Sequence, residues 1–339
     1  MLDGQTLIID IGKSNAKLLL IDEAGEVQFQ RVKTNQSVQA TDYTALDIEG
    51  IQSWLLDSLP AVPMRRQIRH IGITTHGAAF CGVNAKGLAI PAIDYEWDGY
   101  GAWRDRYQGV VDPFEETGSP HLPQGLNAGL QLYWLKNAHP ELWGQVDCWM
   151  PYPQFWAWWL TGQAATEVSS LGCHTHLWNP HANEFSHWAQ REGLVSSFAP
   201  VRPAWDSLGK IRASLSDQLG LNEDCVVHVG LHDSNACLAR HLKAHPQAPV
   251  VSTGTWTVVM TPGLDHELPL MDPRQEQFFN ISIERKPVPT ARFMGGREFH
   301  HLCHGADPAL ATASTLDTIL QAGWQALPHL DPESGELYG

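Results

Sequence analysis

The stretch Leu7-Ile-Ile-Asp-Ile-Gly-Lys-Ser-Asn-Ala-Lys-Leu-Leu-Leu-Ile21 decides the fold class of this chain. Two runs with high β-propensity flank Gly12 and a short polar turn, which predicts a hairpin. A further turn at Glu23–Glu26 leads to a third such run over Val27–Val32. We therefore expect three strands joined by short turns into an antiparallel meander.

Beyond the meander, helical and strand patterns alternate. Apolar residues over Ile48–Leu59 recur at helical spacing and stop before Pro60, and a strand follows over His70–Thr75. Further along, the pattern predicts a strand over Val226–Leu231 and a helix over Ser234–Lys243. A meander that feeds alternating helices and strands predicts an α/β domain with a mixed sheet.

A second domain is predicted after residue 245. Pro246–Pro249 has the composition of a linker, and Val250–Met260 repeats the opening order of strand, glycine-centred turn and strand. We expect an N-terminal domain over 1–245 and a C-terminal domain over 246–339.

Composition limits the classes of function. Of 339 residues, 43% are hydrophobic and 17% charged, which excludes a disordered chain. The net charge of -15 repels phosphate backbones, so no nucleic-acid partner is expected, although backbone amides and a metal can still hold a nucleotide. No apolar run approaches the ~20 residues of a membrane helix. The six cysteines form no CxxC pair, and we expect a reduced, cytoplasmic protein.

The first candidate motif is the turn Gly12-Lys13-Ser14-Asn15 after Asp10. Glycine and small polar residues let backbone N–H groups approach a phosphate, and a carboxylate at the end of the strand can hold hydrated Mg²⁺. The turn lacks the Gly-x-x-x-x-Gly-Lys pattern of a P-loop. Taken alone, the segment is better explained as an ordinary hairpin.

Two further motifs make the pattern more specific. Asp233 follows Gly230-Leu-His at a strand–helix junction, where an aspartate commonly caps the helix. The same position keeps a carboxylate ionised, so it can accept a hydroxyl proton during phosphoryl transfer. Ser252–Thr257 is a second Gly-Thr turn between apolar strands. Two such turns, with an aspartate-bearing junction between them, are more specific than any one of them.

With these motifs the chain resembles the FGGY carbohydrate kinases of the actin–hexokinase superfamily, nearest to the rhamnulokinase and fuculokinase branch. The segments that carry the resemblance are the two glycine turns, Thr75-His76-Gly77, Asp94-Tyr-Glu-Trp-Asp98, Leu160-Thr-Gly162 with Glu167-Val-Ser-Ser, and Gly230–Ala236. The resemblance implies two ribonuclease-H-like domains with mixed sheets around a central cleft. It also implies an ATP- and Mg²⁺-dependent phosphotransferase that acts on a hydroxyl of a small ketose, such as the 6-deoxyketoses L-rhamnulose and L-fuculose. The expected partner is this small-molecule sugar, with a homodimer as a possible assembly.

The resemblance also implies a set of site residues. Asp233 would be the general base and a sugar contact, and Asp10 would position the metal. Phosphate contacts are expected from Gly12, Lys13, Ser14, Asn15, Thr253, Gly254 and Thr255. Sugar contacts are expected from His76, Gly77, Glu96, Trp97 and Asp98.

The chain departs from the family in one respect. Members are longer and carry a glycine-rich segment near the C-terminus, whereas here the one Gly-Gly pair is Gly295-Gly296. We therefore expect the second domain to be incomplete, with apolar positions in a helix over Pro308–Leu327 left uncovered. Two alternatives stay open: a non-catalytic sugar-binding remnant, and a phosphohydrolase of the same superfamily. The motif His174-x-His176 is interpreted as alternate positions on a strand.

Overall fold

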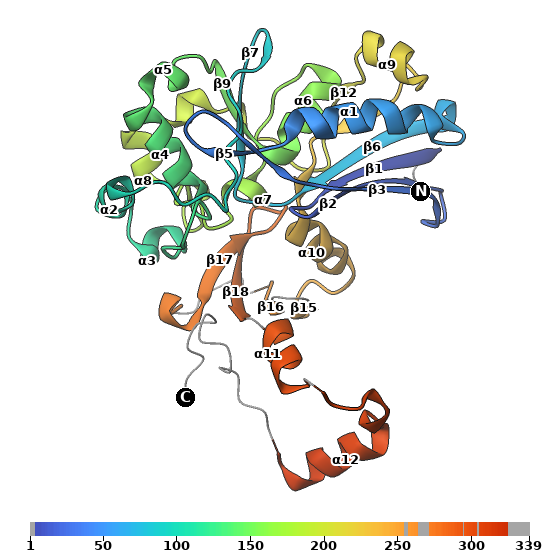
Figure 1. Ribbon diagram of the computed structural model, residues 1–339, viewed down its shortest axis with the longest axis vertical. Coiled ribbons are helices and arrows are strands. Elements are labelled where there is room, and N and C mark those ends of the chain that lie inside the picture. Colours follow the sequence, from blue (N-terminus) through green and yellow to red (C-terminus); the bar gives the residue numbers. More distant parts are fainter. Residues whose placement is uncertain (1–3, 254–256, 264–270, 294, 304, 325–339) are drawn as a thin grey trace. The chain divides into compact units, whose positions relative to one another are not determined.

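The computed structural model describes residues 4–253, 257–263, 271–293, 295–303 and 305–324 (Figure 1). The chain divides into two compact units. The first unit comprises Met1–Ala244 and Phe279–Pro287, and the second comprises His245–Phe278 and Val288–Gly339.

A seven-stranded mixed sheet forms the centre of the first unit. Its strands are β1 (Gln5–Ile11), β2 (Asn15–Ile21), β3 (Val27–Thr34), β6 (Ile68–Thr75), β12 (Ser207–Lys210), β13 (Val226–His228) and β14 (Leu231–His232). The order is β12-β13-β6-β1-β2-β3, and β14 also pairs with β6. Pairing of β1 with β2 and of β2 with β3 is antiparallel, which confirms the predicted meander. Strands β13 and β14 are parallel to β6, which is in turn parallel to β1.

The alternation of side chains along β1 explains its central position. Leu7, Ile9 and Ile11 are fully buried, whereas the intervening residues are only partly buried. Fully burying one aliphatic side chain contributes roughly 1.5–3 kcal/mol, so this face anchors the sheet. Helices α1 (Ile48–Ser58) and α6 (Tyr152–Thr161) lie over one face of the sheet, and α10 (Asp233–Ala244) lies over the other (Figure 1).

Smaller elements complete the first unit. The helices are α2 (Ala102–Gln108), α3 (Phe114–Thr117), α4 (Ala128–Ala138), α5 (Pro140–Trp143), α7 (Val168–Leu171), α8 (His187–Arg191) and α9 (Ala213–Leu219). The strands are β4 (Ser37–Gln39), β5 (Thr44–Leu46), β7 (Phe80–Asn84), β8 (Gly87–Leu88), β9 (Cys148–Pro151), β10 (Trp178–Asn179) and β11 (Glu184–Phe185). They pair as β4-β5, β8-β7-β9 and β10-β11, and an aromatic-rich second core packs among these elements.

A four-stranded sheet includes the predicted second hairpin. Its order is β15-β16-β18-β17, with bounds β15 (Val250–Thr253), β16 (Thr257–Met260), β17 (Gln277–Ile281) and β18 (Pro287–Phe293). Strands β15 and β16 are antiparallel, which confirms the hairpin, and its turn residues 254–256 lie outside the described residues. Two helices follow, α11 (Gly295–Leu302) and α12 (Ala313–Ala322). Among the described residues, none of the helices has the length and apolar character needed to span a membrane.

The helix predicted over Pro308–Leu327 is shorter in the structure. A 3₁₀ turn covers Pro308–Leu310, and α12 spans Ala313–Ala322. Leu316 and Leu320 of α12 are 55% and 66% exposed. These apolar positions are uncovered among the described residues, as predicted.

Two local predictions are wrong. The strand expected over Val226–Leu231 is interrupted, because Gly230 has φ of +82° and a Cβ there would lie 2.9 Å from the Ile73 carbonyl oxygen. His174 and His176 do not lie on a strand, because both have left-handed backbone, with φ of 44° and 61°. Their Nδ1 atoms instead hydrogen-bond the Leu126 carbonyl at 2.9 Å and the Tyr107 hydroxyl at 2.9 Å.

Candidate active site

Three neighbouring parallel strands end at one edge of the main sheet. The register pairs Ile11 of β1 with Thr75 of β6, and Thr75 with His232 of β14. The residues that follow these strands are Gly12, His76 and Asp233, each predicted from sequence to be functional. Ligands of α/β sheets bind preferentially beyond the carboxyl ends of strands, so this edge is the expected location of a site.

A cavity of about 340 Å³ opens at this edge. Its lining residues are Asp10, Gly12, Ser14, Asn15, Lys17, Thr74, Asp233, Ala236 and Cys237. The structure thus brings the predicted metal residue, most of the first phosphate turn and the predicted general base to one place. Lys17 and Thr74 add polar groups that the sequence had not singled out.

The first glycine turn is held by hydrogen bonds within the sheet. Gly12 N–H donates to the Asn15 carbonyl at 2.9 Å, and Asn35 N–H donates to the Ser14 carbonyl at 2.9 Å. The Asn35 side-chain amide donates to the Gly12 carbonyl at 2.8 Å. Because Asn35 fixes both sides of the turn, the exposed Ser14 and Asn15 are presented on a rigid support.

Asp233 is arranged to stay ionised. Its Oδ1 accepts from Ser234 N–H at 2.7 Å and lies 3.0 Å from His232 Nε2. Burial opposes ionisation, but the charge and hydrogen bond of His232 and the Ser234 N–H outweigh it and hold the pKa of Asp233 below its usual value. The side chain remains about 40% exposed, so a substrate hydroxyl can reach it. Asp233 therefore both begins α10 and offers an ionised acceptor to the cavity.

A buried network supports the segment that carries Asp233. Gln154 of α6 donates to the Val229 and Gly230 carbonyls at 3.1 and 2.9 Å. His232 N–H donates to the Ser169 hydroxyl oxygen at 3.2 Å, and Ser169 N–H donates to Glu167 at 2.9 Å. The resulting chain of contacts runs from a fully buried carboxyl group to the residue beside Asp233.

Glu167 is the most perturbed carboxyl group of this network. Burial raises its pKa to about 7, although the hydrogen bonds from Ser169 and the charge of His232 act in the opposite direction. This carboxyl group therefore changes its charge near neutral pH, below the surface of the site.

Asp10 lies beside Asp233 in the cavity and is electrostatically different from it. Burial raises the pKa of Asp10, the Lys17 ammonium 3.4 Å away lowers it, and the charge of Asp233 raises it again. Two carboxylates that line one cavity are the hard oxygen ligands that Mg²⁺ prefers. The residues present therefore fit the metal that the resemblance implies.

His76 follows β6 at this sheet edge and belongs to the segment that the resemblance assigns to sugar binding. It is buried, and its ring centroid is 5.5 Å from that of Tyr95 and 5.1 Å from that of Tyr152. Burial lowers its pKa, against the hydrogen bond to Gly77 and the charge of Asp233, so the imidazole is neutral at pH 7. Its Nδ1 is 2.8 Å from the Gly77 carbonyl, which can only accept, so Nδ1 carries the proton and Nε2 is an acceptor.

Gly77 is required by close packing. A Cβ at this position would lie 2.8 Å from Nε2 of His232, the atom that contacts Asp233. A larger residue would displace that imidazole, so Gly77 acts on the predicted base through His232.

Lys13 does not line the cavity with the rest of its turn. Its ammonium group forms an ion pair with buried Asp94 and a second one with Glu96 at 3.2 Å, and it lies 5.4 Å from the centre of the Tyr95 ring. Burial raises the pKa of Asp94, but hydrogen bonds from Lys13 and Ser37 outweigh it and lower the pKa overall. The structure therefore places Lys13 beside the segment predicted to contact the sugar.

Trp97 and Asp98, the last two residues predicted to contact the sugar, lie in different environments. The Trp97 ring packs against Tyr100 and Trp134, with centroids 4.6 and 4.9 Å apart, and so belongs to the second core. Asp98 is 59% exposed and forms an ion pair with Arg104.

The second phosphate turn is only partly described. Thr253 ends β15 and is exposed, whereas Gly254 and Thr255 lie outside the described residues. Their predicted role in phosphate binding stays a prediction.

Sequence reasoning missed several supporting residues. His232 is adjacent to the predicted base, and Glu167 begins the quoted Glu-Val-Ser-Ser segment, so local signals existed for both. Gln154 gave no such signal, because its partners at Val229 and Gly230 are 75 and 76 residues away along the chain.

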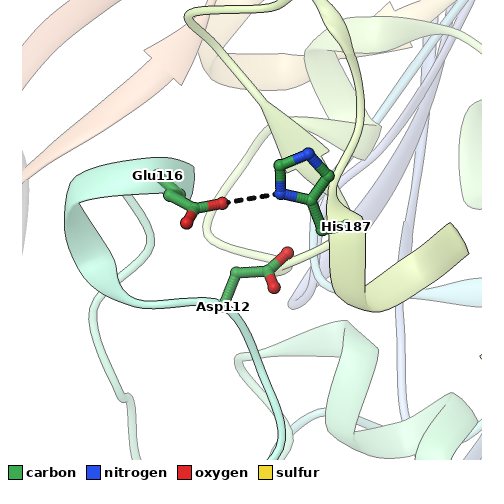
Figure 2. A group of neighbouring side chains, drawn as sticks. All are labelled: Asp112, Glu116 and His187. Carbon is green, nitrogen blue, oxygen red and sulfur yellow. Dashed lines mark hydrogen bonds and ion pairs between the residues drawn. The ribbon is translucent and has the colours of Figure 1, made fainter. Parts of the chain in front are cut away.

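A second cluster of titratable side chains lies apart from this site. Ligand atoms of Asp112, Glu116 and His187 are within 4.8 Å of one another (Figure 2). Asp112 already accepts from Trp188 N–H at 2.6 Å and from the Arg191 guanidinium at 3.1 Å, and Glu116 pairs with His187 at 3.0 Å. These contacts join the segment around α3 to the start of α8, and they account for the cluster without a ligand.

Comparison with known proteins agrees with this geometry. Residues 5–239 match the N-terminal domain of the FGGY family of carbohydrate kinases, and residues 245–338 match the C-terminal domain of FGGY carbohydrate kinases. An L-fuculokinase of Salmonella typhi is 26% identical over 264 residues, covering 75% of this chain and 56% of that protein. A rhamnulokinase of Oceanobacillus iheyensis is 23% identical, covering 78% of this chain and 57% of that protein. The chain thus spans little more than half the length of these two relatives.

Solved structures give the same fold. A carbohydrate kinase from Novosphingobium aromaticivorans superposes with a TM-score of 0.89 at 35% identity, covering 97% of this chain and 73% of that one. A xylulose kinase from Lactobacillus acidophilus, at 16% identity, superposes with a TM-score of 0.70 over 94% of this chain and 66% of that one. Sequence motifs, sheet topology and these similarities lead to one conclusion: the chain belongs to the FGGY family of carbohydrate kinases.

Proposed function

We propose that this chain carries the catalytic base of an ATP-dependent kinase that phosphorylates a hydroxyl group of a small ketose. The observation that carries the proposal is one cavity lined by Asp233, Asp10 and the first glycine turn. An ionised carboxylate beside a phosphate-binding turn is the arrangement that phosphoryl transfer to an alcohol requires.

Asp233 would act as the general base. As the oxygen of the sugar hydroxyl attacks the γ-phosphorus of ATP, its proton passes to the Asp233 carboxylate and ADP leaves with the bridging oxygen. His232, 3.0 Å from Oδ1, would hold the carboxylate in position. The protein adds little covalent chemistry, because this reaction depends mainly on positioning and charge neutralisation.

The phosphate side would be formed by the glycine turns. Backbone N–H groups at Gly12, Lys13, Ser14 and Asn15, and the side chains of Ser14 and Asn15, would contact phosphate oxygens, together with Thr253, Gly254 and Thr255. Asp10 would hold Mg²⁺, which when bound neutralises negative charge on the phosphates.

The sugar side would be formed by His76 with Gly77, Glu96, Trp97 and Asp98. Nε2 of the neutral His76 imidazole can accept a hydrogen bond from a sugar hydroxyl. Glu96 and Asp98 are 57% and 59% exposed, so their carboxylates can accept hydrogen bonds from further sugar hydroxyl groups. Asp98 would first have to leave its ion pair with Arg104 or share it.

A 6-deoxyketose such as L-fuculose or L-rhamnulose is the proposed substrate class. Similarity to proteins named L-fuculokinase and rhamnulokinase supports this, as does the resemblance of the His232-Asp233-Ser234 motif to that branch. An apolar pocket for the sugar's methyl group would discriminate by only ~1–3 kcal/mol, so related ketoses should react slowly. A preference for glycerol or a fully hydroxylated hexose would overturn the substrate assignment.

The experiment compares Asp233→Asn with a matched control, Asp57→Asn, which changes an exposed carboxylate on α1. With L-fuculose and L-rhamnulose as acceptors, Asp233→Asn should reduce sugar-dependent ADP release by ~10²–10⁴-fold. Asp57→Asn should leave ADP release and sugar binding unchanged. In Asp233→Asn, sugar binding measured by calorimetry should weaken far less than turnover.

Other outcomes would point to the alternatives. Near-normal turnover in Asp233→Asn would leave Asp233 with only its role at the start of α10. ADP release that does not need the sugar would indicate a phosphohydrolase, and sugar binding without any ADP release would indicate a non-catalytic binding protein.

A further inference from the structure

A second cavity, of about 450 Å³, lies within the first unit. It is bordered by α1, the segment around β8, the end of α6 and Arg212 just before α9. It shares no lining residue with the cavity that contains Asp10 and Asp233. Its volume falls in the range of roughly 300–1,000 Å³ that is typical of small-molecule sites.

Two consecutive indole rings line this cavity. Trp158 and Trp159 are partly buried and pack against the core, unlike their fully buried neighbour Trp156. An indole that is only partly covered by protein offers a flat apolar surface, and its N–H remains available at the edge. This part of the cavity suits a ring-shaped ligand.

Two cationic side chains line the same cavity. The Arg212 guanidinium donates to the Trp158 carbonyl at 2.7 Å and lies 5.4 Å from the centre of the Trp158 ring. Within the described part of the chain, its Nε has no hydrogen-bond partner, and neither Arg212 nor Lys86 forms an ion pair with a carboxylate. In a chain of net charge -15, two cations without carboxylate partners are complementary to an anionic ligand.

The cavity also contains groups that accept hydrogen bonds. Glu49 and Gln52, both on α1, supply a carboxylate and an amide oxygen. A flat aromatic acid could contact the indoles and the cations, but it would bring no donors to these acceptors, which are exposed or partly exposed to water. A ring that carries several hydroxyl groups satisfies all three kinds of group.

From this combination we propose that the cavity is a second ligand site, one that binds a sugar phosphate. The sugar ring lies against Trp158 and Trp159, the phosphate meets Arg212 and Lys86, and the hydroxyl groups donate to Glu49 and Gln52. The site is independent of the proposed kinase reaction, because its residues and its cavity are separate from those around Asp233.

The test is calorimetric titration of the 339-residue protein with glucose 6-phosphate and fructose 1-phosphate. Glucose and inorganic phosphate, which supply the ring and the charge separately, should each bind at least about tenfold more weakly. Lys86→Met and Arg212→Leu should each weaken binding about tenfold, the loss expected for one charge-assisted contact. Lys210→Met, an exposed lysine outside the cavity, should have no effect.

His76→Ala separates the two cavities. It should leave binding of the sugar phosphates unchanged, whatever it does to phosphorylation. If His76→Ala abolished binding and Lys86→Met did not, the ligand would occupy the proposed active site and the inference would be overturned. Failure of both sugar phosphates to bind more tightly than inorganic phosphate would also overturn it.

A folding control is needed for one variant. Arg212 also holds the Trp158 carbonyl near the end of α6, so Arg212→Leu removes a structural contact. If that variant does not fold, Lys86→Met decides, because Lys86 is exposed. Trp159→Leu, compared with Trp205→Leu at a 56% exposed position outside the cavity, tests the ring contact in the same titration.

Discussion

The hairpin of β1 and β2 and the hairpin of β15 and β16 share a sequence pattern but not their surroundings. Strand β1 has neighbours on both sides, and Leu7, Ile9 and Ile11 are fully buried. In the four-stranded sheet β15 stands at the end of the order, and Val251 is 56% exposed. The same sequence pattern of a glycine hairpin therefore contributes very differently to the stability of the fold, because the residues that bury each hairpin come from other parts of the chain.

Paired substitutions in the two hairpins test this difference most strongly. Ile9→Ala should lower the free energy of unfolding of the first unit by roughly 2–5 kcal/mol, because it leaves a cavity in the main core. Val251→Ala should change the free energy of unfolding of the second unit, which contains this strand, by less than about 0.5 kcal/mol, as expected for an exposed position.

Denaturant titration followed by tryptophan fluorescence measures Ile9→Ala, because all of the 14 tryptophans except Trp256 and Trp324 precede residue 245. Circular dichroism during the same titration measures Val251→Ala. A loss for Val251→Ala as large as that for Ile9→Ala would show that the second hairpin is covered as fully as the first.

The buried carboxyl group of Glu167 should make the stability of the first unit depend on pH. Glu167 has a pKa of about 7 in the folded protein against a usual 4.5, so between these values the unfolded state ionises first. Its contribution to stability is complete below about pH 4.5 and is lost as the pH rises to about 7. One pKa unit corresponds to ~1.4 kcal/mol, so the loss is up to about 3 kcal/mol.

Glu167→Gln should remove that dependence, and its stability relative to the wild type should therefore rise between pH 5 and 7.5. The free energy of unfolding at several pH values measures this effect. Glu115→Gln, at an exposed position on α3, is the matched control and should follow the wild type. A parallel pH profile for Glu167→Gln and the wild type would contradict the raised pKa.

The smallest effect is expected in α12. Leu320 is 66% exposed, so Leu320→Ser should change the thermal stability of the second unit by an amount equivalent to less than about 0.5 kcal/mol. Circular dichroism during heating measures it, with Leu242→Ser in the buried face of α10 as the contrasting substitution. A loss above about 1 kcal/mol for Leu320→Ser would mean that another surface covers α12 in solution.

Local sequence predicted the elements that depend on near neighbours. The meander, α1, α10 and the β15–β16 hairpin follow from β-propensity, helical spacing and turn residues. Where a distant contact decides the backbone, the prediction was wrong. At Gly230 the Ile73 carbonyl leaves no room for a side chain, and at His176 the Tyr107 hydroxyl holds a left-handed residue out of any strand.

The candidate site shows the same division. Glycine turns and an aspartate at a strand–helix junction are local signals, and from them the sequence by itself predicted Asp10, Gly12 and Asp233 as chemical groups, whereas His76 was predicted from the family resemblance. Only the tertiary structure placed Asp10 and Asp233 in one cavity, because that requires β1, β6 and β14 to end in register at one sheet edge.

The state of these groups was also decided by the tertiary structure. A charge depends on burial and on neighbours brought from elsewhere in the chain: His232 keeps Asp233 ionised, and complete burial keeps Glu167 partly protonated near pH 7. Lys13, which the turn assigned to phosphate, is drawn to Asp94, 81 residues away. Residue types and their spacing thus determined which chemistry is available, and long-range packing decided which groups meet and with what charge, because electrostatic energy depends on distance and burial rather than on sequence order.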